Sequence, residues 1–84
     1  MGFLGRRGLV ALDMQELKIN GTYKHYKGHI YKVFGVAKHS ESLEDLVIYA
    51  TVEAPDKLWA RPKGMFLGDV AVDGQSIPRF KLIS

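Results

Sequence analysis

From residue 21 onward, hydrophobic and polar residues alternate along much of the chain, and this period of two is typical of β-strands. The longest such segment, residues 30–38, reads IYKVFGVAK. Side chains of a strand point alternately to its two faces, so Tyr31, Val33 and Ala37 share one face. We assign this odd-numbered set to the interior, because lysines lie near both ends of the even-numbered set. Gly35, in the middle, would permit a sharp bend.

Five or six short strands are predicted in residues 21–84. Asp73-Gly74 is a strong signal for a two-residue hairpin turn, and Pro55-Asp56 marks another turn. Short strands at such close spacing predict a small closed or nearly closed β-barrel, because closure removes exposed strand edges. One helical turn, KGMFLG, is expected to plug the barrel end. The predicted strands cover residues 22–26, 30–38, 46–52 and 58–61, the two arms of the Asp73-Gly74 turn, and a last segment near 79–83.

The chain is predicted to be one domain with an N-terminal extension. Its 84 residues allow one domain at most, with a small core. Residues 1–20 form the extension, in which Val10, Met14 and Leu17 follow the i, i+4, i+7 spacing of a helix face. This spacing predicts a short amphipathic helix over about residues 9–18, ahead of the β-domain of residues 21–84.

Composition and charge point to a soluble, cytoplasmic protein. No apolar run approaches the roughly 20 residues of a membrane-spanning helix. The chain has no cysteine, which excludes disulfides, thiolate zinc sites and a cysteine nucleophile. The net charge is +3, and residues 1–39 hold seven basic and two acidic side chains, whereas residues 41–56 hold five acidic side chains and no Lys or Arg. A mild positive field on one part of the surface follows from this distribution.

An ordered series of short motifs runs from residue 21 to residue 83. Together these motifs resemble a family of small bacterial proteins, domain of unknown function family 1653. The resemblance implies a compact, mostly β domain of SH3-like type, and it carries no established activity. The motifs are His25-Tyr26-Lys27-Gly28, Tyr31-x-Val33, Ala37-x-His39-Ser40-Glu41, Leu46-Val47-x-Tyr49, Trp59-x-Arg61-Pro62-x-x-Met65-Phe66, Asp73-Gly74 and Pro78-Arg79-Phe80.

Two positions depart from the family pattern. Gly68 stands where the family often has an acidic residue, and Ala50 stands where it often has a polar or charged one. If either position lines a site, that site is altered in this chain.

The leading functional hypothesis is a non-catalytic binding or interaction module. Polar and aromatic residues fall where the predicted strands end, and we expect them to converge at one end of the barrel. A small anionic ligand or a protein is the expected partner, and a second copy of the chain is a further candidate. The candidate ligand-binding residues are His25, Tyr26, His39, Ser40, Glu41, Trp59 and Arg61.

Three of these residues have a structural reading beside the functional one. Trp59 is expected in the core. Arg61 either pairs with an acidic residue, the candidates being Glu41, Glu44 and Asp45, or binds an anion through its guanidinium fork. His39 either fixes the loop that follows it or contacts a ligand.

Two alternatives come from other functional classes. Lys24, Lys27, Lys32 and Tyr26 combine basic and stacking side chains, which is typical of surfaces that bind RNA or single-stranded DNA. His39 and Ser40 are the candidate pair for a small hydrolase or transferase. The histidine spacing does not suit a metal on a strand, and no phosphate-loop motif is present, so we expect no metal and no cofactor.

Overall fold

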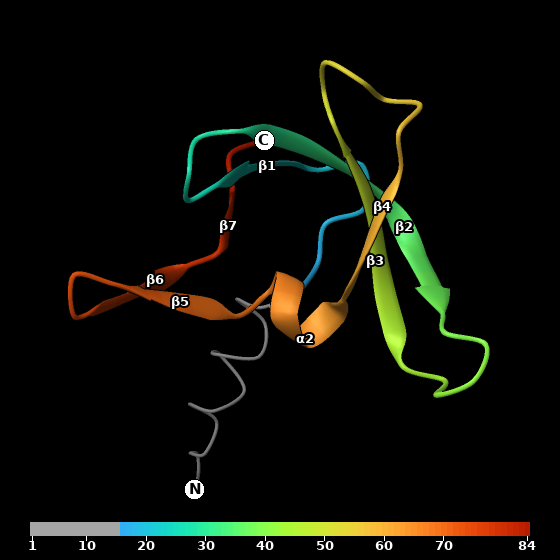
Figure 1. Ribbon diagram of the computed structural model, residues 1–84. Coiled ribbons are helices and arrows are strands. Elements are labelled where there is room, and N and C mark those ends of the chain that lie inside the picture. Colours follow the sequence, from blue (N-terminus) through green and yellow to red (C-terminus); the bar gives the residue numbers. More distant parts are fainter. Residues whose placement is uncertain (1–15) are drawn as a thin grey trace, which may run out of the picture.

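The computed structural model describes residues 16–84, which fold into two antiparallel β-sheets and one short helix (Figure 1). The larger sheet has five strands in the order β4-β3-β2-β1-β7, and β5 pairs with β6 in a separate hairpin. The prediction of a mainly β domain is therefore confirmed. The elements are β1 (Thr22–His25), β2 (Ile30–Lys38), β3 (Asp45–Thr51), β4 (Trp59–Pro62), α2 (Lys63–Phe66), β5 (Asp69–Val72), β6 (Gln75–Pro78) and β7 (Phe80–Leu82).

The five-stranded sheet is open. Among the described residues, the end strands β4 and β7 are paired on one side only, β4 with β3 and β7 with β1. Residues 16–84 form seven short strands, where five or six were predicted. The last two belong to different sheets: β6 pairs with β5 and ends at Pro78, whereas β7 pairs with β1.

The tight turns follow the local signals of the sequence. Asp73 and Gly74 both have positive φ, 52° and 79°, as a two-residue hairpin turn of type I′ requires. This turn joins β5 to β6, as predicted. Gly28, with φ of 110°, closes the turn between β1 and β2, where a side chain would be strained.

A β-bulge in β2 changes which side chains face the interior. Val33 pairs with Tyr49, but the next pair is Gly35 with Ile48, so Phe34 is an extra residue. The interior alternation therefore holds for Tyr31 and Val33 and is lost beyond the bulge. Ala37, which was expected inside, is exposed because an inserted residue moves all following side chains to the other face.

The core is built mainly from aromatic rings. Phe66 of α2 is fully buried and stacks on Phe80, with ring centroids 4.0 Å apart and planes 8° from parallel. Tyr23 and Tyr49 meet Phe66 edge-on at 5.3 and 5.2 Å. Phe66 thus fills the position predicted for the helical turn, whereas its neighbour Met65 is half exposed.

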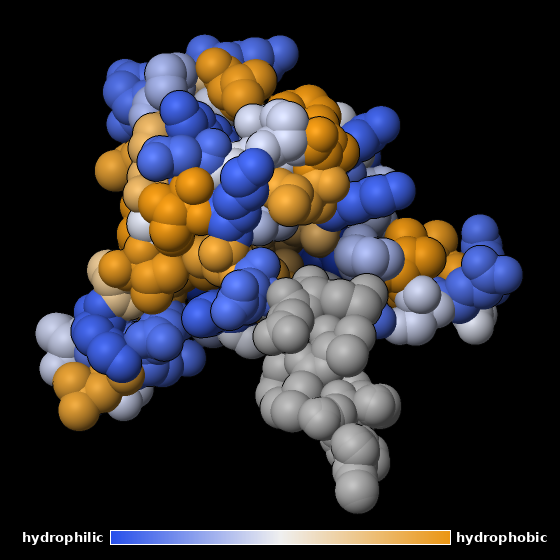
Figure 2. Space-filling model, turned by 180° about the vertical axis from the view of Figure 1, so that it is seen from behind, coloured by the Kyte–Doolittle hydropathy of each residue, from blue (hydrophilic) through white to orange (hydrophobic). Residues whose placement is uncertain are grey.

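The expectation of a buried Trp59 is wrong. Its side chain is 59% exposed, since β4 is an edge strand of only four residues. Other large apolar side chains are also exposed, and Figure 2 shows hydrophobic patches among hydrophilic residues on one face of the molecule.

The segment before β1 lies against the sheet. Leu17 packs on the core, and the amide of Lys18 donates to the Tyr23 hydroxyl at 2.9 Å. The amide of Asn20 donates to the Val33 carbonyl at 2.8 Å. The helix predicted over residues 9–18 lies largely outside the described residues, and residues 16–18 are not helical. In the part of the chain that is described, no helix is long and apolar enough to cross a membrane.

We expect Phe66→Ala to lower the free energy of unfolding by about 3–5 kcal/mol, because it empties the centre of the aromatic core. Urea denaturation monitored by circular dichroism measures this loss. Met65→Ala, one position earlier on the same helix, is the control and should cost less than about 1 kcal/mol, as should Trp59→Ala. Equal losses for Phe66 and Trp59 would contradict the core described above.

Candidate functional site

Five side chains, one from each strand of the larger sheet, form a cluster on its inner face. Strand pairing places Tyr23 opposite Tyr31 and His25 opposite Phe80, so these residues share one face. The alternation of β3 adds Tyr49 to this face, and Arg61 follows because it pairs with buried Val47. We call His25, Tyr31, Tyr49, Arg61 and Phe80 the arginine–aromatic cluster.

Arg61 is held in place by aromatic groups. Its Nε donates a hydrogen bond to the Tyr49 hydroxyl at 3.1 Å, and its guanidinium carbon lies 5.9 Å from the centre of the Phe80 ring. Both contacts fix the orientation of the guanidinium group without neutralising its charge. The terminal nitrogens are the part of the fork suited to a bidentate anion.

The rings of the cluster meet one another edge-to-face. The centroid of the Tyr31 ring lies 5.3 Å from that of Tyr49 and 5.5 Å from that of Phe80. The centroids of His25 and Phe80 are 4.9 Å apart. Interplanar angles of 68–80° are those that aromatic quadrupoles favour. The cluster is therefore a rigid support for the groups that carry charge.

Arg79 adds a second guanidinium group near the cluster. Its backbone is fixed on both sides, since its amide donates to Gly68 and its carbonyl accepts from Tyr26, each at 3.0 Å. Its side-chain Nε is buried and has no hydrogen-bond partner among the described residues. A buried N–H without an acceptor is costly, so a bound acceptor at this point would be favourable.

Partial burial and the positive groups around His25 lower its pKa. Its pKa is lowered from the ordinary value of 6.5, first by partial burial and next by the charges of Arg61 and Arg79. Lys27 and His29 lower the pKa of His25 further. The Lys27 amide donates to His25 Nδ1 at 3.1 Å, so the neutral ring carries its proton on Nε2.

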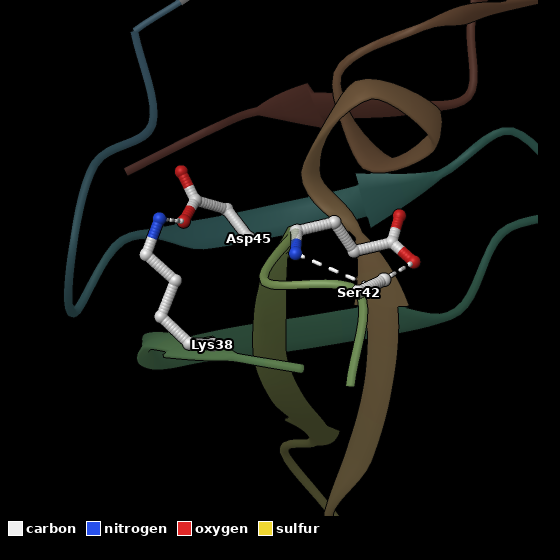
Figure 3. A network of polar contacts seen from close by, with 4 residues as sticks. Lys38, Ser42 and Asp45 are labelled. Carbon is white, nitrogen blue, oxygen red and sulfur yellow. Dashed lines mark hydrogen bonds and ion pairs between the residues drawn. The ribbon is translucent and has the colours of Figure 1, made fainter. Parts of the chain in front are cut away.

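Pairing of Arg61 with an acidic residue is not observed. Asp45 is engaged by Lys38 at 2.8 Å, the only ion pair between side chains of residues 16–84 (Figure 3). This exposed pair closes the β2–β3 hairpin. The hydrogen bond from Lys38 holds the pKa of the Asp45 carboxyl below its usual value. The structure thus leaves Arg61 without a carboxylate partner in the described chain.

His39 fixes its own loop, which is the structural one of its two readings. Its Nδ1 accepts hydrogen bonds from the amides of Glu41 and Ser42 at 3.1 and 3.3 Å. In the same loop, the Ser42 hydroxyl bonds to Glu44 at 3.3 Å (Figure 3). Within residues 16–84, no hydrogen bond joins His39 to the Ser40 hydroxyl or to a carboxylate, so the pair lacks the geometry of a nucleophile and its base.

The predicted ligand-binding residues divide between two ends of β2. His25 and Tyr26 lie at its start, where their rings are 4.6 Å apart, and Arg61 is close enough to influence His25. The loop with His39, Ser40 and Glu41 follows its end, nine strand residues or roughly 30 Å away. Trp59 shares the face of Arg61, two positions before it on β4. The expected convergence at one end is therefore wrong for the loop.

The family model described as "Protein of unknown function (DUF1653)" matches residues 21–82. The chain belongs to this family. A crystal structure of a DUF1653 protein from Bordetella bronchiseptica is similar to it, with a TM-score of 0.69 and 29% identity, over 83% of this chain and 91% of that one. No curated protein is significantly similar to the chain. The resemblance inferred from the motifs is thus confirmed, and neither match names an activity.

The two departures from the DUF1653 pattern lie outside the arginine–aromatic cluster. A Cβ atom on Gly68 would come within 2.9 Å of the Gly64 carbonyl oxygen, so a side chain there requires a backbone shift. Ala50 is fully buried and pairs with Lys32 on the opposite face of the sheet. A charged side chain at either position would need a different local structure.

Sequence reasoning missed Tyr31, Tyr49 and Phe80 as site residues and named Arg79 only within the motif Pro78-Arg79-Phe80. All four lie within the family motifs, but each also had a reading as an ordinary strand residue. The usable signal was the period of two in β3, which places Tyr49 beside Val47. Among the described residues, no three His, Asp or Glu side chains lie together as a metal site would require.

We expect nuclear magnetic resonance titration of His25 to give a pKa below 6.5. Because the folded state binds this proton less readily than the unfolded chain, stability should decline as pH falls from about 6.5 through the folded-state pKa. Arg61→Gln removes one repelling charge and should raise the pKa of His25. His25→Gln cannot titrate and should remove this part of the pH dependence. A His25 pKa unchanged by Arg61→Gln would contradict the proximity of the two groups.

Proposed function

We propose that the chain is a binding module that recognises an anionic ligand at the arginine–aromatic cluster. One observation carries the proposal. The charges of Arg61 and Arg79 both act on His25, and neither arginine forms an ion pair within residues 16–84. Arginine forks are suited to carboxylate and phosphate groups, which they bind bidentately.

The surrounding rings favour a ligand that is anionic and also partly planar. Tyr31 is half-buried and can contact a ligand, whereas Tyr49 and Phe80 are buried and support the Arg61 guanidinium group from the core. The Tyr31 ring can pack against an apolar or aromatic part of a ligand, while the charged groups fix its orientation. A bare inorganic anion would use only part of this site.

We further infer that the larger sheet is an SH3-like barrel left open between β4 and β7. Pairing of β1 with β7 joins strands near opposite ends of the described chain, and the bulge in β2 increases the twist of the sheet. The absence of cysteine fits a reducing compartment, so we place the protein in the bacterial cytoplasm.

Phenyl phosphate should bind the full chain more tightly than inorganic phosphate, because only the former has a ring to pack against the cluster. We expect Arg61→Gln to weaken binding of phenyl phosphate by at least about tenfold, since a hydrogen bond to a charged group contributes roughly 1.5–3 kcal/mol. Arg61→Lys keeps the charge but loses the guanidinium fork, so its affinity for phenyl phosphate should lie between those of the unmodified chain and Arg61→Gln. Isothermal titration calorimetry measures all three affinities.

Lys63→Gln is the matched control for charge. Lys63 lies near Asp45 and is not a member of the cluster, and its removal lowers the net charge by the same amount. Equal weakening by Lys63→Gln and Arg61→Gln would show a diffuse effect of charge and would contradict the assigned site.

The second candidate function is binding of RNA or single-stranded DNA on the outer face of the sheet. Lys24 and Lys32 share this face, since both alternate with the buried residues of β1 and β2. Tyr26 is exposed, and Lys27 Nζ lies 5.8 Å from its ring centre. Basic groups beside an exposed ring are the combination used for single-stranded nucleic acids.

A salt titration tests this candidate. Binding of a single-stranded oligonucleotide of about ten residues should weaken steeply between low and physiological salt, because phosphate contacts release counterions. Fluorescence anisotropy at two salt concentrations measures the change. Lys32→Gln should reduce the slope, whereas no binding at low salt would end the proposal.

A further inference from the structure

We propose that a hollow at the corner between β6 and β7 binds one nucleotide unit, with its phosphate between Lys24 and Lys81 and its base on the Tyr26 ring. The inference deepens the nucleic-acid candidate and rests on it, because it names the place on the outer surface where one nucleotide is held. The hollow shares His25 with the arginine–aromatic cluster but does not include Arg61. The hollow has a volume of about 310 Å³ and is lined by Lys24, His25, Tyr26, Ile77, Pro78 and Lys81.

The hollow exists because the chain changes direction between the two sheets. β6 ends at Pro78, and the chain then turns to enter the larger sheet as β7 (Figure 1). The Tyr26 amide donates to the Arg79 carbonyl at 3.0 Å, which ties the end of β1 to this corner. Ile77 and Pro78 therefore form an apolar wall opposite the end of β1.

Two positively charged side chains lie side by side in the lining of the hollow. Lys24 of β1 and Lys81 of β7 are direct cross-strand partners, and both are exposed. Like charges at directly opposed positions destabilise a strand pair. None of the described lining residues is acidic, so no carboxylate in the hollow offsets this repulsion. A phosphate between the two ammonium groups would offset it.

Tyr26 supplies the surface for a planar group. Its ring is 38% exposed and is supported on one side by the His25 ring, at 4.6 Å and an angle of 36°. The His25 ring is in turn fixed by the Lys27 amide and by Phe80. An exposed tyrosine that is held rigid loses little conformational freedom when a base stacks on it.

The size of the hollow suits one nucleotide. Its volume is at the lower limit of small-molecule sites, which span roughly 300–1,000 Å³. Lys32 lies outside it, although it shares the outer face with Lys24. Lys32 therefore distinguishes the general basic surface from the hollow itself.

The experiment titrates the full chain with three probes at low salt: inorganic phosphate, adenosine monophosphate, and a single-stranded oligothymidylate of about ten nucleotides. Chemical-shift changes of backbone amides locate and quantify binding. The variants are Lys81→Gln and Tyr26→Ala in the hollow, with Lys32→Gln as the control of equal charge change. All three positions are exposed, and thermal unfolding checks that each variant folds.

We expect adenosine monophosphate to bind more tightly than phosphate and to shift the amides of residues 24–26 and 77–81. Lys81→Gln and Tyr26→Ala should each weaken both nucleotide probes by at least about fivefold, while Lys32→Gln affects only the longer strand. If Lys81→Gln and Lys32→Gln weakened binding of adenosine monophosphate equally, or if Tyr26→Ala did not weaken it, the proposal for the hollow would be overturned while nucleic-acid binding remained. No binding of either nucleotide probe would overturn both proposals.

Discussion

The stacking of Phe66 on Phe80 is the contact on which the rest of this small domain depends. It joins the four-residue helix after β4 to the last strand, and its rings lie 4.0 Å apart. A domain of this size buries too little surface to tolerate a second weak region, so one aromatic centre must connect most elements. Tyr23, Tyr49 and Phe80 meet there from β1, β3 and β7. The same rings then orient Arg61 and His25.

Acidic and basic side chains are distributed unevenly between the two ends of β2. The acidic loop after β2 satisfies itself through Lys38, Ser42 and the His39 ring. Near the start of β2, His25 lies close to Arg79 and Lys27, and none of the three forms an ion pair within residues 16–84. The charged and polar groups at the loop after β2 therefore bind one another, whereas the basic groups near the start of β2 are available to bind an anion.

Several features followed from local pattern alone. The period of two located most strands within a residue or two, and the Asp73-Gly74 pair identified the last hairpin because its backbone angles suit few other residues. Trp59 was expected in the core, but burial depends on whether a strand is central or at the edge. Pairing with an acid was one of two readings of Arg61, and the structure gives it Tyr49 as a hydrogen-bond partner instead.

The sequence by itself determined the strand periodicity, the turns and, through its ordered motifs, membership of the DUF1653 family. Only the tertiary structure decided the bulge after Val33, which reversed the faces of the rest of β2. It alone also brought Lys24 beside Lys81 and His25 beside Phe80. Turns depend on the conformational limits of two or three residues, whereas these pairings join segments more than fifty positions apart and depend on how the whole sheet closes around its core.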